Sequence, residues 1–275
     1  GGLVLHLGPE MGPTKAARTY VAWEQAQTLL ADYQTYRDPV QSVVVEAHAI
    51  ANVTEPAEQL ALLDRLQNLS MDWEWNIDEH VAPLFEPEGL SVAVADRTWY
   101  FPLEALDFHT TSGHKDALRR RVMATIMRTP TVWHDAKADL GAQWLGDPLD
   151  AYGAELHDTL VMAFTAGEFN LALKPLAKLK MGRDPLEFPG AMRNLSLETC
   201  RRYGGADARN TYDLFAILHK QIVERNQLDI YERIERPIIP LLTSMERYGH
   251  PVDMAAASEY RAQLEEDAER IRLYF

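Results

Sequence analysis

The chain has 275 residues, of which 47% are hydrophobic and 25% are charged, and its formal net charge is −14. This composition is typical of a folded globular protein and excludes an intrinsically disordered chain. The negative charge argues against a protein that coats nucleic acid through many phosphate contacts. Because no apolar run approaches the ~18–20 residues that span a bilayer, and the start lacks a signal-peptide pattern, we expect a cytoplasmic protein with no membrane partner.

The first third of the chain is predicted to combine helices with short strands. Residues 1–40 form an N-terminal extension with no recognisable chemistry and a helix-forming stretch at Ala16–Gln34. A β-rich run at Ser42–Val45 predicts a strand. A proline at the first helical position favours a helix over Ala57–Leu66, and a short strand is expected directly afterwards, at Leu69–Glu74.

Two alternating runs, Gly89–Ala95 and Thr98–Pro102, are separated by the dipeptide Asp96-Arg97 and predict a β-hairpin. Strands and helices then alternate, and the second half of the chain is mainly helical. The elements expected after the hairpin are a helix at Lys115–Met127, a strand at Thr131–Trp133, a helix at Ala136–Leu145, a strand at Glu155–His157, and helices at Asp158–Thr165, Leu173–Leu179, Ser196–Glu224 and from Tyr231 onward. This order predicts an α/β fold, a mixed β-sheet flanked by helices with a helical C-terminal segment.

Two carboxylates stand in the strand at Leu69–Glu74, namely Asp72 and Glu74. Alternate residues of a strand share a face, so these side chains point the same way about 6–7 Å apart along the backbone. Oxygen ligands at this spacing suit hard divalent cations. An isolated pair of this kind is more often two solvated acids at a strand end, so the pair alone does not assign a function.

A second acidic group follows the strand Thr131–Trp133. Asp135 stands at the strand-to-helix junction, where a carboxylate often caps the helix. Asp139 lies four residues later on the same helix face, near the carboxyl end of a strand, where open α/β sheets bind their ligands.

A third group lies in the long helix predicted at Ser196–Glu224. Tyr203 and Asp207 are four residues apart and therefore share one face of the helix. Between them, Gly204 and Gly205 each cost roughly 1 kcal/mol relative to alanine in a helix. Such a pair predicts a close approach of the helix backbone to another element or to a ligand.

Taken together, these three groups resemble the motifs of the DEDD exonuclease superfamily, in its tyrosine subtype. The flanking segments are similar to the 3′→5′ proofreading domain of family A DNA polymerases of the bacterial polymerase I type. They are the hairpin ending at Tyr100-Phe101-Pro102-Leu103, the segment Asp158–Met181 with Leu173-x-x-Leu176-Ala177, and Asp207–Leu214. The resemblance covers roughly Val43–Phe275 and places the exonuclease domain at residues 41–230. It implies a ribonuclease H-like fold. It also implies that the protein acts in the cytoplasm of a bacterial or virus-infected cell.

The C-terminal part extends the resemblance. Glu235–Asp253 is similar to the stretch by which such polymerases pass from the exonuclease domain into the thumb. Residues 231–275 are therefore expected to be the start of a truncated, thumb-like helical region, attached in a longer chain to a polymerase portion. No palm or fingers follow Phe275, so we expect no polymerase activity from this chain.

The resemblance implies a catalytic site with two divalent metal ions, Mg²⁺ or Mn²⁺. Their expected ligands are Asp72, Glu74, Asp139 and Asp207, and Tyr203 is expected to orient the attacking water. The implied reaction removes nucleoside 5′-monophosphates from the 3′ ends of single-stranded DNA.

Four further residues are candidates for substrate binding: Trp75, His134, Asp135 and Lys137. The family usually has Asn at position 135, and it has a small residue and Thr where this chain has Trp73 and Trp75. Trp75 can stack on a terminal base, whereas core packing is the commoner fate of tryptophan. His134 fits a core or capping role better than a metal-ligand role, and Lys137 fits either a phosphate contact or a pair with Asp135 or Asp139.

Two other interpretations stay open. The first is a free-standing exoribonuclease resembling the ribonuclease D group, whose motifs are similar. The second is a catalytically inactive exonuclease fold retained as a scaffold, for which the substitutions at positions 73, 75 and 135 would be early signs.

Overall fold

The computed structural model describes residues 50–76, 86–103, 108–141, 147–184, 186, 195–249 and 251–273. The helix predicted at Ala16–Gln34, the strand predicted at Ser42–Val45 and the boundary predicted at residues 40–41 lie outside these residues. The observations below concern the described part of the chain.

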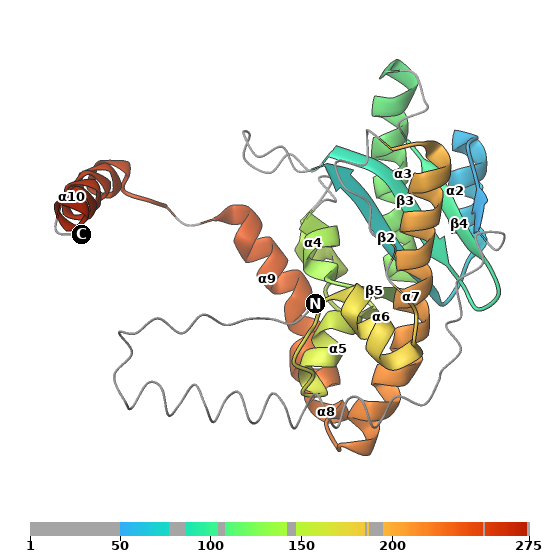
Figure 1. Ribbon diagram of the computed structural model, residues 1–275. Coiled ribbons are helices and arrows are strands. Elements are labelled where there is room, and N and C mark those ends of the chain that lie inside the picture. Colours follow the sequence, from blue (N-terminus) through green and yellow to red (C-terminus); the bar gives the residue numbers. More distant parts are fainter. Residues whose placement is uncertain are drawn as a thin grey trace. The chain divides into compact units, whose positions relative to one another are not determined.

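A mixed six-stranded sheet forms the centre of the fold (Figure 1). Its strands, in chain order, are β1 (Ile50–Asn52), β2 (Leu69–Asn76), β3 (Glu86–Ala93), β4 (Thr98–Pro102), β5 (Thr131–Trp133) and β6 (Leu156–Asp158). In space they follow the order β1-β4-β3-β2-β5-β6. Strands β2, β3 and β4 are an antiparallel meander, whereas β1 pairs in parallel with β4, β5 with β2, and β6 with β5.

The predicted hairpin is confirmed as β3 and β4, which pair from Gly89 with Pro102 to Ala93 with Thr98. The turn is closed by a hydrogen bond of 2.9 Å from the Val94 amide to the Arg97 carbonyl. The first strand of the hairpin begins at Glu86, earlier than predicted. Strand β1 was not predicted, because a segment of three residues with one buried side chain carries no strand periodicity.

Helices surround the sheet. They are α2 (Pro56–Arg65), α3 (Phe108–Arg128), α4 (Ala136–Gly141), the 3₁₀ turn η2 (Pro148–Ala151), α5 (Thr159–Thr165), α6 (Leu173–Met181), α7 (Leu197–Glu224), α8 (Leu228–Ile230), the π-helical turn η4 (Tyr231–Glu235), α9 (Arg236–Tyr248) and α10 (Met254–Arg272). These helices confirm the predicted α/β fold with a helical C-terminal segment. Helix α3 begins seven residues before the predicted Lys115, at Phe108.

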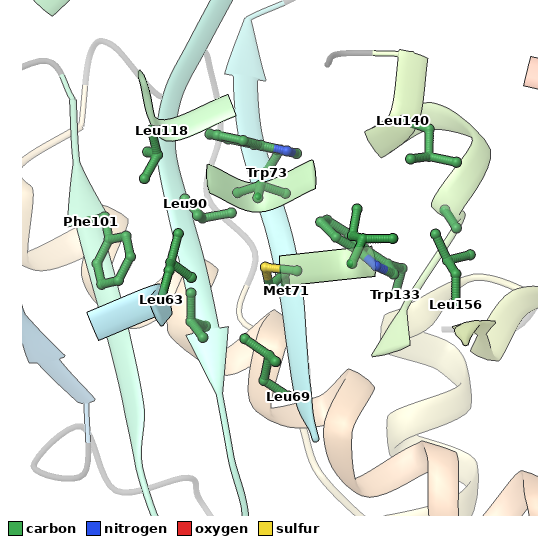
Figure 2. Close-up of a cluster of buried hydrophobic side chains, with 14 of the residues drawn as sticks. Leu63, Leu69, Met71, Trp73, Leu90, Phe101, Leu118, Trp133, Leu140 and Leu156 are labelled. Carbon is green, nitrogen blue, oxygen red and sulfur yellow. The ribbon is translucent and has the colours of Figure 1, made fainter. Parts of the chain in front are cut away.

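The alternation along β2 separates two environments. Leu69, Met71 and Trp73 are buried in the main hydrophobic core, which they form with side chains of helices α2 and α3 and of the neighbouring strands (Figure 2). The intervening residues of β2 face α7, and the Ser70 hydroxyl donates a hydrogen bond of 2.7 Å to the Ala208 carbonyl of that helix. Strand periodicity thus places the carboxylates of β2 under α7 rather than in the core.

Helix α7 lies directly against the sheet because Gly204 and Gly205 have no side chains. A Cβ atom on Gly204 would lie 2.4 Å from the Ser91 hydroxyl and 2.6 Å from Glu74 Oε1, and one on Gly205 would lie 2.5 Å from Ile50. The predicted close approach of the helix backbone is therefore confirmed, and the element approached is the sheet.

The C-terminal helices continue from this framework. Tyr231 is fully buried against side chains of α5 and α7, and Ile239 of α9 joins the main core. Helix α9 packs against α4 and η2, whereas α10 buries none of its residues. Within the described ranges, no helix combines the length and the apolar character needed to cross a membrane.

We expect Gly205→Ala to lower the free energy of unfolding by about 1–3 kcal/mol, because the added methyl group overlaps Ile50. Gly113→Ala is the matched control, since nothing lies within 4 Å of the added atom in helix α3. Gly113→Ala reduces the backbone entropy of the unfolded chain and should therefore raise the free energy of unfolding by about 0.5–1 kcal/mol. Urea unfolding of both variants measures the difference, and equal effects would show that α7 does not require a glycine at position 205.

Candidate active site

Three carboxylates from two elements meet where β2 lies under α7. Asp72 and Glu74 come from β2 and Asp207 from α7, and one oxygen of each lies within 4.8 Å of the others. Glu74 and Asp207 are buried, with 7% and 8% of their surface exposed. The described residues therefore contain a group of oxygen ligands that can hold a metal ion.

Asp139 approaches this group from α4. It is 2% exposed, and its Oδ1 atom accepts a hydrogen bond of 3.2 Å from the Trp73 amide, between the two carboxylates of β2. Besides burial, the charge of Asp139 contributes to the raised pKa of Glu74, and the charge of Asp72 contributes to the raised pKa of Asp139. The structure thus brings together all four carboxylates of the predicted metal-ligand set, with Asp139 outside the closest three.

Burial dominates the protonation of this cluster. It raises the pKa of Asp72 to about 7 and that of Asp207 to about 8, and it raises the pKa of Glu74 and Asp139 well above their ordinary values. Repulsion between the neighbouring charges adds to the rise for Glu74, Asp139 and Asp207. Glu74 Oε1 is buried without a hydrogen-bond partner among the described residues. Carboxylates buried close together repel one another, and a divalent cation relieves that cost.

Tyr203 lies beside the carboxylates, one helical turn before Asp207. Its phenol oxygen accepts a hydrogen bond of 2.7 Å from Lys174 Nζ, which lies 4.1 Å from the ring centroid. The same ammonium is 3.9 Å from Asp207 Oδ2. The sequence analysis missed Lys174, because nothing in helix α6 distinguishes it from the other two lysines there.

Asp158 is a second residue that the sequence analysis missed. Its buried carboxylate accepts hydrogen bonds from the amides of Asp135 and Ala136, at 3.1 and 2.8 Å, and it also caps α5. One side chain therefore fixes the start of α4, which carries Asp139, and the start of α5. The only sequence signal for this role is the position of Asp158 at a strand end before a helix.

Asp135 is held in the left-handed backbone region, with φ of 67°. Asn and Asp tolerate this conformation better than most residues, so Asp135, in place of the usual Asn of the resembled family, adds no backbone strain. The side chain of Asp158, rather than that of Asp135, accepts hydrogen bonds from the amides of Asp135 and Ala136 at the start of α4. Burial raises the pKa of both Asp139 and Asp158, and the charge of Asp135 adds a smaller rise to each.

The other predicted substrate-binding residues occupy different surroundings. Lys137 Nζ donates to Glu246 Oε1 of α9 at 2.7 Å, and this partner was not among those that the sequence suggested. His134 Nδ1 lies 2.8 Å from the Thr159 hydroxyl, and burial lowers its pKa to about 4, so the ring is neutral at neutral pH. Trp75 follows a shift in the register between β2 and β3 and packs half-buried against the core, whereas Trp73 is 3% exposed.

The raised pKa values predict how the metal-free protein responds to pH. A carboxyl group whose pKa is higher in the folded than in the unfolded state loses stabilisation as the pH rises from about 4 through the folded value. The pH range over which this stabilisation is lost therefore ends near the folded-state pKa, which is about 7 for Asp72 and about 8 for Asp207. In EDTA, Asp207→Asn should therefore be more stable than the wild type by on the order of 1–2 kcal/mol at pH 8, with a smaller gain at pH 5.

Urea unfolding at the two pH values measures this difference. Asp96→Asn is the control for net charge, because the Asp96 side chain is 78% exposed in the hairpin turn. Mn²⁺ should stabilise the wild type and not Asp207→Asn. A gain from Asp207→Asn that does not depend on pH would contradict the electrostatic account.

No protein-family model matches the chain. DNA polymerase I of Rhizobium leguminosarum is 26% identical over 137 residues, which are 45% of this chain and 14% of that polymerase. The chain thus matches only a small part of that relative's length.

Three solved structures are similar in fold at low sequence identity. The catalytic core of RRP6 from Trypanosoma brucei has a TM-score of 0.54 at 14% identity and matches 75% of this chain and 54% of its own. Escherichia coli RNase D, an exoribonuclease, has a TM-score of 0.53 at 13% identity, over 71% of this chain and 50% of its own. Brucella melitensis NrnC with bound Mg²⁺ has a TM-score of 0.50 at 11% identity, and the match covers 74% of this chain and 96% of NrnC. At these identities the solved structures show a shared fold, a ribonuclease H-like mixed sheet with flanking helices.

Proposed function

We propose that the chain is a metal-dependent 3′→5′ exonuclease that removes nucleoside 5′-monophosphates from the 3′ ends of single-stranded DNA. The observation that carries this proposal is the buried group of Asp72, Glu74 and Asp207, with Asp139 and Tyr203 beside it. Metal-free hydrolases use pairs of carboxylates, whereas four carboxylates gathered from β2, α4 and α7 suit hydrolysis of phosphodiesters assisted by two metal ions.

The donor set fits two Mg²⁺ or Mn²⁺ ions. Asp72, Glu74 and Asp207 would hold one ion, Asp72 would also contribute to the second, and Asp139 would support the second ion. All these donors are carboxylate oxygens, which hard divalent cations prefer, and the unpaired Glu74 Oε1 needs a cationic partner. When bound, the ions supply a lowered pKa for the attacking water and stabilise the charge that develops on the leaving oxygen.

The remaining residues would position the substrate strand. Tyr203, of the tyrosine subtype, orients the attacking water through its hydroxyl, since burial raises its pKa and leaves the phenol protonated. Trp75, His134, Asp135 and Lys137 are proposed to contact the strand. The neutral His134 ring offers hydrogen bonds rather than charge, and Lys137 must exchange its pair with Glu246 for a phosphate to make such a contact.

The match to DNA polymerase I supports DNA as the substrate and supports a proofreading role within a longer polymerase chain. On this proposal residues 41–230 are the exonuclease domain and residues 231–275 lead toward the polymerase portion. A second candidate is an exoribonuclease, which is supported by the fold similarity to RNase D and RRP6. The two candidates share the cleavage chemistry and differ in how the site treats the 2′-hydroxyl of the sugar.

The test is degradation of DNA and RNA oligonucleotides of one sequence, labelled at the 5′ end, with Mg²⁺ or Mn²⁺ and with EDTA. We expect a metal-dependent ladder that shortens from the 3′ end, faster on DNA. Asp72→Ala should slow it by at least about a thousandfold, because the variant loses a ligand to both ions.

Asp96→Ala is the matched control, since it removes an exposed carboxylate of the hairpin turn and should leave the rate unchanged. Faster cleavage of RNA would favour the exoribonuclease candidate. Absence of cleavage by the folded wild type on both substrates would leave the inactive scaffold as the remaining interpretation.

A further inference from the structure

Lys174 is the basic side chain of the described residues that reaches both Tyr203 and Asp207. It is the second residue of α6, and its side chain is 21% exposed. The Nζ atom lies 2.7 Å from the Tyr203 oxygen but 3.9 Å from Asp207 Oδ2, so its short contact is with the phenol and not with the carboxylate.

The other lysines of α6 make different contacts. Lys178 pairs with Asp184 at 3.1 Å and Lys180 with Glu168 at 2.6 Å, both carboxylates. An ammonium that served only as a counter-ion would move to the carboxylates of the site, where its Coulomb energy is larger. The short bond to a neutral hydroxyl indicates that Lys174 also orients the phenol.

The chemistry of the two groups sets the direction of the hydrogen bond. An ammonium has donors and no acceptor, so the Tyr203 oxygen must accept from Lys174. The single phenolic hydrogen then points away from Lys174. Tyr203 packs against the buried cluster of Ile50, Tyr100 and Cys200, which restrains the ring while Lys174 restrains its oxygen.

We propose that Lys174 is a positioning residue that holds the Tyr203 hydroxyl in the orientation used for nucleotide removal. This inference rests on the proposed exonuclease function. Lys174 acts through Tyr203 and not by holding metal or substrate. Its loss should therefore lower the maximal rate and leave the binding of metal and oligonucleotide nearly unchanged.

The test is a double-mutant cycle with Lys174→Met, Tyr203→Phe and the double variant. The single-turnover rate of 3′ nucleotide removal is measured at saturating oligonucleotide and Mn²⁺. Each single change should slow removal about tenfold to a hundredfold, the effect of losing one charge-assisted hydrogen bond. The double variant should be within about threefold of the slower single variant, because both changes remove the same interaction.

Three further measurements define the role of Lys174. Lys174→Arg, which keeps charge and donors, should recover part of the rate. Lys178→Met is the matched control on the same helix and should cleave like the wild type. The Mn²⁺ concentration for half-maximal rate should stay within about threefold of the wild-type value in Lys174→Met.

A measurement that does not depend on activity is urea unfolding, in EDTA, of the four proteins of the cycle: the wild type, Lys174→Met, Tyr203→Phe and the double variant. The equilibrium constants should show a coupling of roughly threefold or more between the two positions, because the contact exists in the folded protein. Any one of three results would overturn the inference by itself. They are a rate loss in the double variant equal to the product of the two single losses, an unchanged rate in Lys174→Met, and absence of coupling between the two positions in unfolding. A wild type that cleaves neither DNA nor RNA would instead overturn the proposed function, and the positioning role with it.

Discussion

The crowding of Asp72, Glu74, Asp139 and Asp207 is the constraint on which the rest of the structure depends. Carboxylates in a partly desolvated space repel one another, and burial raises the pKa of each. Such an arrangement persists only if the framework supplies the energy to hold it, or if a cation neutralises it. The main core on the opposite face of the sheet is the part of the fold that can supply this energy.

The framework restrains the carboxylates through several local features. Strand alternation turns Asp72 and Glu74 toward α7, and Gly204 leaves the space that the Glu74 carboxylate occupies. The Trp73 amide holds Asp139, and Asp158 fixes the start of the helix that carries it. Strand alternation and the Trp73 amide are backbone restraints, whereas the restraint at the start of α4 comes from the Asp158 side chain.

The sequence predicted what local periodicity determines, and it missed what depends on tertiary contact. The hairpin, the strand at Thr131–Trp133 and the long helix follow from alternation, turn residues and helical spacing, and so does the meeting of Asp72 with Glu74 on one strand face. Strand β1 is too short to show a pattern. The partner of Lys137 lies 109 residues away, and Lys174 reaches Tyr203 across 29 residues, so no local pattern reports either contact.

Helix α9 packs against α4, the helix that carries Asp139, and the pair of Lys137 with Glu246 joins their exposed sides. The two helices form one mechanical unit, although only one of them belongs to the site. A substitution in α9 that disturbs this packing would therefore shift α4 and, with it, Asp139. Substitutions on the face of α9 that contacts α4 should appear together with compensating changes in α4. The active site thus constrains the sequence of a helix that supplies none of its ligands.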